Sequence, residues 1–108
     1  MKQSKFELFC LSLKDDKPSF ELSPALVGLW YDGHGSWEAG HREVQKRTDV
    51  DSFWVHAYLH RKEGDLENAA YWYKRCDKIL PSQSSDDEWR QIATVLISRQ
   101  PSEKASEG

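Results

Sequence analysis

The sequence predicts an all-α fold of about five helices, arranged as antiparallel helix-turn-helix pairs. Helix-length segments with apolar residues on one face, each flanked by capping residues, are the first observation. The second is the corner at Gly64 and Asp65, where a residue suited to a left-handed helix end is followed at once by a good N-cap. The length of 108 residues fits one domain with one core.

The N-terminal third contains one ambiguous element and one clear helix. Residues 6–13 fit either a helical stripe or a strand alternation, and we favour a short helix. A polar loop follows at residues 14–19. The clear helix starts at Ser23, which is a good N-cap, with Pro24 at the first helical position. It continues to Tyr31 and is expected to stop within residues 32–35, where two glycines stand close together.

The remaining sequence predicts four more helices. The first three cover residues 36–47, 52–63 and 66–80, and Pro81 is expected to end the third. Ser85 and Glu88 have the spacing of a capping box, which would start a last helix over residues 86–99. We therefore expect a single helical domain over residues 1–100, with a repeat-like core at 23–80, a capping helix at about 86–99 and a disordered tail at 101–108.

The segment around the corner resembles a tetratricopeptide repeat. Ala69 and Cys76 are small residues that let two helices approach, Tyr73 is a large residue between them, and Pro81 follows. A weaker copy surrounds Gly35, which is 29 residues before Gly64, whereas the usual spacing is about 34. The segment WVHAYLHRKEGD also resembles a family of small bacterial and fungal proteins of unknown function. That resemblance implies fold and kinship, and no activity.

Composition disfavours several classes of function. The net charge of −3 argues against nucleic acid as a partner, because such proteins usually present a basic face. No apolar run is long enough to span a membrane. Cys10 and Cys76 lack metal or redox spacing and are expected to be free thiols, which suits the cytoplasm. No nucleophile elbow or phosphate-binding glycine loop is present, so an enzyme is not the favoured interpretation.

A protein-binding surface is the first functional hypothesis. Trp54, Tyr58 and Arg61 share one helical face, which in a repeat of this kind tends to line the inner groove. Aromatic residues beside arginine are typical of binding hot spots. Trp72 belongs to a run of three aromatic residues that cannot all face one core. The alternative is that the last helix or the N-terminal segment covers these side chains.

A metal site is the second hypothesis. His56 and His60 are four residues apart and share a helical face, and Glu38 and His41 form an E-x-x-H pair on the preceding helix. In helical bundles such pairs bind metal when they face one another. Asp32 lies in the nearby turn. The alternative is that the histidines are interior residues with hydrogen bonds to neighbouring groups.

These observations lead to two expectations for function, with a purely structural subunit as a third option. The first is a cytoplasmic, non-catalytic module that binds a protein or peptide, or a second copy of itself, without a cofactor. The second is a small metal-binding protein or metal-dependent enzyme, in which a divalent transition metal is held by the histidine and carboxylate cluster.

Overall fold

The computed structural model describes residues 3–100 and consists there of helices and connecting segments. The helices are α1 (Lys5–Leu11), the 3-10 helix η1 (Ser12–Lys14), α2 (Pro24–His34), α3 (Trp37–Gln45), α4 (Val50–Lys62), α5 (Leu66–Arg75) and α6 (Ser85–Arg99). The all-α prediction is confirmed, with six α-helices where about five were expected. The expected disordered tail at 101–108 lies outside the described residues.

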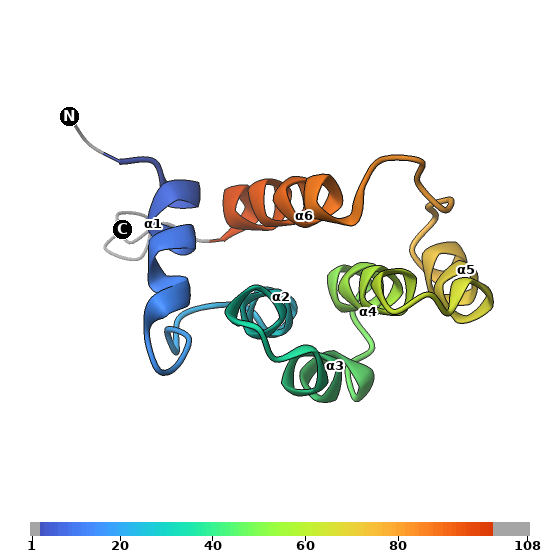
Figure 1. The fold of residues 1–108 in the computed structure, drawn as a ribbon, viewed down its shortest axis with the longest axis horizontal. Coiled ribbons are helices and arrows are strands. Elements are labelled where there is room, and N and C mark those ends of the chain that lie inside the picture. The colour runs from blue at the N-terminus through green and yellow to red at the C-terminus, as the bar shows by residue number, and fades with distance from the viewer. Residues whose placement is uncertain (1–2, 101–108) are drawn as a thin grey trace.

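Helices α2, α3, α4 and α5 each pack against the next one along the chain. In Figure 1, α2, α3, α4 and α5 are seen nearly end-on in an arc, α6 runs across above them, and α1 stands at the left. The central helix is α4, which contacts α2, α3, α5 and α6. Every residue from Ser52 to His60 is accordingly buried. None of the described helices is both long and apolar enough to cross a bilayer.

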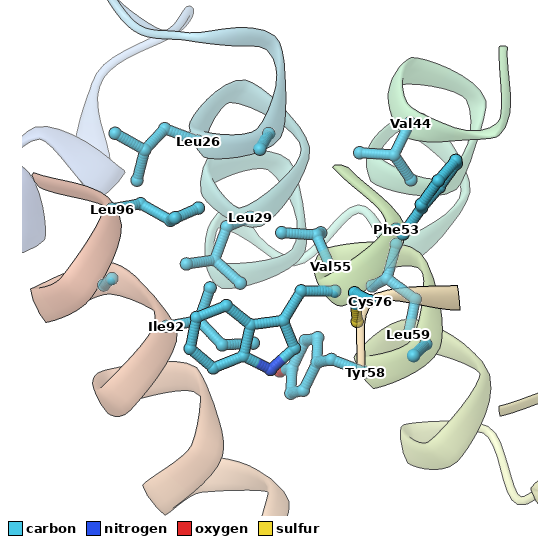
Figure 2. Packing of buried hydrophobic residues seen from close by; sticks show 14 of the residues in the cluster. Leu26, Leu29, Val44, Phe53, Val55, Tyr58, Leu59, Cys76, Ile92 and Leu96 are labelled. Atoms are coloured by element: carbon cyan, nitrogen blue, oxygen red, sulfur yellow. The ribbon is translucent and has the colours of Figure 1, made fainter. Parts of the chain in front are cut away.

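One hydrophobic core joins α2, α4 and α6. Figure 2 shows Leu26 and Leu29 of α2 beside Leu96 and Ile92 of α6, with Val55 of α4 between the helices. All five side chains are at most 2% exposed. Because all three helices share these contacts, α6 is part of the core and not an appendage.

The helix starts follow the capping rules, with one correction. Ser23 accepts a hydrogen bond from the backbone N–H of Leu26, and Asp49 and Asp65 cap α4 and α5 in the same manner. The N-terminal segment is helical, as favoured. The capping box expected from Ser85 and Glu88 is wrong: Ser84 caps α6, and the Glu88 carboxylate is buried instead.

One helix end falls where the sequence predicted it, and another does not. Helix α2 passes through Asp32 and Gly33 and ends at Gly35, whose φ of 104° is the left-handed conformation that favours glycine. Helix α5 ends at Arg75, well before Pro81. There the chain reverses through Asp77, with φ of 61°, and the N–H of residue 78 donates to the carbonyl of residue 73. Pro81 therefore does not end α5.

Candidate functional site

Three of the four histidines converge between α3 and α4. His56 and His60 lie one turn apart on α4, and their rings stack with centroids 4.9 Å apart. They are only 4% and 7% exposed. Helix α4 is capped by Asp49 and packs against α3. Two of the histidines are thus held by a buried helix and not by a loop.

His41 completes the group from α3. Its Nε2 lies 3.1 Å from Nε2 of His56, and its ring centroid is 5.0 Å from that of His60. One nitrogen from each of the three rings lies within 4.8 Å of the other two. Trp37 stacks on His41 at 4.9 Å and donates its indole N–H to the carbonyl of Leu59, which ties α3 to α4 beside the cluster.

A second tryptophan closes the cluster from α5. The ring of Trp72 stacks on His56 with centroids 4.2 Å apart and also packs against Phe53. Trp72 was expected at a partner surface; part of its ring instead forms a wall of the histidine cluster. Two aromatic planes therefore restrict the orientation of His41 and His56, the kind of support that precise ligand geometry requires.

Glu63 is a member of the site that the sequence interpretation missed. Its Oε2 lies 2.8 Å from Nδ1 of His60, so the carboxylate accepts the Nδ1–H and leaves Nε2 as the free lone pair. The Glu63 side chain is 37% exposed and reaches the cluster from the solvent side. The signal was present as an H-x-x-E spacing in HRKE, at the end of the predicted helix.

Burial keeps two of the three rings, His41 and His56, uncharged near neutral pH. The pKa of His56 falls to about 3, mainly because burial penalises the imidazolium, and secondly because His41 and His60 would repel it. The pKa of His41 is lowered as well, again chiefly by burial. Neutral imidazoles are the form that binds metals, so no proton has to be removed from these two rings at pH 7.

One buried nitrogen of the cluster lacks a partner. Nδ1 of His56 is buried and makes no hydrogen bond to any of the described residues. In the 3.1 Å contact between His41 and His56, one Nε2 must carry a proton and the other must accept it. A proton on Nε2 of His56 would leave its Nδ1 as a bare lone pair, which costs less to bury than an unpaired N–H.

The two acidic residues expected at the metal site do not reach it. Asp32 is buried on the other side of α4, where its carboxylate accepts the hydroxyl of Tyr58 at 2.6 Å and the ammonium of Lys62 at 3.0 Å. Glu38 is exposed and does not belong to the group of converging ligand atoms. The physical reason is that Asp32 continues helix α2 and so faces α4, and Glu38 lies on the solvent side of α3.

The aromatic groove expected at Trp54, Tyr58 and Arg61 is not open. Trp54 is 4% and Tyr58 is 1% exposed, and α6 packs over this side of α4. The indole of Trp54 and the guanidinium of Arg61 both donate to the buried carboxylate of Glu88, at 3.3 and 2.9 Å. Tyr73 donates to the same carboxylate at 2.6 Å. These residues form an interior polar network instead of a partner surface.

Comparison of the chain with models of protein families, with curated proteins and with solved structures gives no match.

Proposed function

We propose that this protein binds a divalent transition metal between α3 and α4 through His41, His56 and His60. The observation that carries the proposal is the convergence of three imidazoles, with ligand atoms within 4.8 Å of one another, from two helices. In a tetrahedral zinc site with Zn–N bonds of 2.0–2.1 Å, neighbouring nitrogens are separated by about 3.3 Å. The 3.1 Å contact between Nε2 of His41 and Nε2 of His56 already has about this spacing.

The donor set favours a reactive site over a purely structural one. Three protein ligands leave a fourth position for water or a small ligand, as in catalytic zinc sites, whereas structural sites have four. Glu63 orients His60 through Nδ1, the role that carboxylates commonly have behind a metal-bound imidazole. Because its side chain is partly exposed, Glu63 also supplies a carboxylate beside the position from which solvent reaches the cluster.

The unpartnered Nδ1 of His56 sets a limit on affinity. A metal on Nε2 moves the remaining proton of this ring to Nδ1, where no described residue accepts it. Loss of one outer hydrogen-bond partner typically lowers metal affinity by about 10-fold to 100-fold. We therefore expect weaker binding than in a site where all three rings are supported.

The test is metal titration of protein purified without a metal-affinity tag and treated with a chelator. Zn²⁺, followed by calorimetry, is expected to bind at one equivalent and to raise the melting temperature; a concentration 100 times the dissociation constant gives about 2.7 kcal/mol of stabilisation. Co²⁺ is expected to show the absorption of a tetrahedral site. His41→Ala should abolish both effects, and Glu63→Gln should weaken Zn²⁺ binding by about 10-fold or more.

His34→Ala is the matched control, because His34 is the histidine outside the cluster and bonds the carbonyl of Leu13. This variant is expected to bind Zn²⁺ as the wild type does. His41 is partly exposed, so its loss should leave the fold intact. The proposal is wrong if the folded wild type takes up no Zn²⁺ or Co²⁺, or if His41→Ala binds either ion as tightly as the wild type. The histidines would then be interior residues only.

Protein or peptide binding is a second candidate, and one observation favours it on a different face. The guanidinium of Arg75 lies over the rings of Phe53, Tyr71 and Trp72, with its carbon 5.0–5.5 Å from their centroids. Tyr71 is 55% exposed. Exposed aromatic residues with arginine are typical of hot spots. Sedimentation analysis of Tyr71→Ala beside the wild type tests this face for self-association: a wild-type dimer that the variant loses supports it, and a monomer at high concentration excludes self-association.

The location and the kinship of the chain are further proposals. A cytoplasmic location is supported by Cys10 and Cys76, which are both free thiols. The likeness to a degenerate tetratricopeptide pair is supported by Ala69 and Tyr73, which are both buried where α5 packs on α4.

A further inference from the structure

A second candidate site lies on the opposite side of α4, in a cavity between α1, α2, α4 and α6. Its volume is about 370 Å³, within the range of roughly 300–1,000 Å³ that is typical of small-molecule sites. Its lining combines apolar and charged side chains. The residues that line it and carry the argument are Phe6, Leu13, Trp89, Lys62, Asp86 and Arg90.

The innermost charges of this cavity are already paired. Asp32 accepts hydrogen bonds from Tyr58 at 2.6 Å and from Lys62 at 3.0 and 3.2 Å. Its carboxylate side chain is only 2% exposed. Both oxygens are therefore satisfied within the protein, and most of the hydrogen-bonding capacity of Lys62 is used as well. Asp32, Tyr58 and Lys62 therefore form a polar surface inside the cavity, and other groups must recognise a ligand.

The outer charges are available. The carboxylate of Asp86, in the first turn of α6, makes no hydrogen bond and no ion pair to any residue in the range 3–100. Arg90 has five N–H donors, of which one contacts Asp87 at 3.1 Å. The two residues are four apart on α6 and so lie on the same side of that helix. A free carboxylate and a largely free guanidinium thus stand together at the cavity.

The apolar side chains that line the cavity are held in place by contacts within the protein. The ring of Trp89 lies 6.4 Å from that of Phe6 and 5.7 Å from that of Phe9. Its indole N–H donates to the carbonyl of Leu29 at 3.1 Å, so the polar atom of the ring is satisfied. A fixed, flat apolar surface that needs no hydrogen bond accepts an aromatic or branched side chain by stacking and burial.

We propose that this cavity binds a free amino acid with an aromatic or branched apolar side chain. The ammonium group of the ligand pairs with Asp86, its carboxylate with Arg90, and its side chain lies along Phe6, Leu13 and Trp89. A purely anionic ligand would leave Asp86 unpaired beside it, and a purely cationic ligand would leave most of the Arg90 donors unused. The proposal uses none of the three clustered histidines and stands apart from the metal site.

The experiment is a titration with L-phenylalanine, followed by NMR on the indole N–H of Trp89. For a ligand of this size we expect a dissociation constant of about a millimolar or below. Phenethylamine and 3-phenylpropionate each lack one charged group. Each is expected to bind at least about 10-fold more weakly than phenylalanine. Asp86→Asn should weaken phenylalanine and phenethylamine but not phenylpropionate, and Arg90→Gln should weaken phenylalanine and phenylpropionate but not phenethylamine.

Arg99→Gln is the matched control, because Arg99 also lies on α6 and pairs with Asp51 away from the cavity. It should leave all three affinities unchanged. Asp86 and Arg90 are exposed, so their variants are expected to fold. The proposal is overturned if the Trp89 signal does not move at tens of millimolar phenylalanine, if phenethylamine or phenylpropionate binds as tightly as phenylalanine, or if neither variant changes its affinity.

Discussion

Glu88 shows how one residue can organise an interior. Its carboxylate is 1% exposed and accepts hydrogen bonds from Tyr73, Trp54 and Arg61, which come from two other helices. Burial and the hydrogen bond to Glu88 raise the pKa of the Tyr73 hydroxyl, which keeps it a donor. From the sequence, Glu88 was expected in a capping box with Ser85, since nothing local to the last helix shows that three donors from α4 and α5 will meet it.

Stability of the metal-free protein should depend on pH through His56. Its pKa is about 3 when folded and 6.5 when unfolded. Between these values the unfolded chain binds the extra proton, so stability rises with pH in this window and is lost as pH falls below about 6.5. One such group contributes at most about 1.4 kcal/mol per pH unit. The lowered pKa of His41 acts in the same direction.

Urea denaturation at a series of pH values, with a chelator present, measures this slope. His56→Gln removes the group and is expected to make the dependence between about pH 4 and 6.5 shallower. Equal slopes for the variant and the wild type would mean that His56 is not held uncharged in the folded protein.

Among the elements, the starts of helices were easier to predict than their ends. Ser23 and Asp65 are caps that accept the backbone N–H three residues further on, so the sequence alone identifies them. Arg75 was missed as the end of α5 because the chain there turns through Asp77, a non-glycine residue with positive φ that carries little sequence signal. Pro81 is a stronger sequence signal for a helix end, but α5 ends before it.

The close approach of α2 and α3 depends on Gly40. A Cβ at this position would lie 2.5 Å from the backbone oxygen of Gly28, and backbone cannot move aside as a side chain can. Alanine gains about 1 kcal/mol over glycine in a helix. Gly40→Ala is nevertheless expected to lower the free energy of unfolding, by about 1–3 kcal/mol, because the two helices must separate.

The same variant should weaken Zn²⁺ binding, since His41 is the next residue and moves with α3. Ala39→Gly is the control: it loses about 1 kcal/mol of helix propensity and leaves the spacing unchanged, so its Zn²⁺ affinity should stay that of the wild type. Denaturation and calorimetry on both variants separate these effects. A Gly40→Ala protein more stable than the wild type would show that the approach is not tight.

At the scale of the whole molecule, the sequence predicted that the histidines lie close together, but it did not predict which residues surround them. His56 and His60 share a face by spacing, and a short connection makes α3 the neighbour that supplies His41. Asp32 and Glu38 were misplaced because nearness in the chain does not decide which side of a helix faces the cluster. Whether α6 would cover α4 depended on long-range packing, which no local pattern reports.

The position of α6 leads to the last prediction, which concerns a chain shortened to residues 1–83. If α6 were a separate cap, its removal would uncover the groove at Trp54 and Tyr58 and leave a folded remainder. Instead α6 contributes Ile92 and Leu96 to the core, each at most 2% exposed, and Glu88 to the polar network. Burial of each such apolar side chain stabilises by about 1.5–3 kcal/mol, against a total of about 5–15 kcal/mol for a domain.

The shortened chain also leaves Arg61, Tyr73 and Trp54 without their shared acceptor. We therefore expect it to lose cooperative thermal unfolding and to bind a dye specific for exposed apolar surface. A chain of residues 1–100 is the control and should melt as the full protein does, because it retains every described residue. Circular dichroism and calorimetry on the two chains decide the matter. A cooperatively folded 1–83 fragment would mean that α2 to α5 form a stable unit on their own, with the groove on α4 free for a partner.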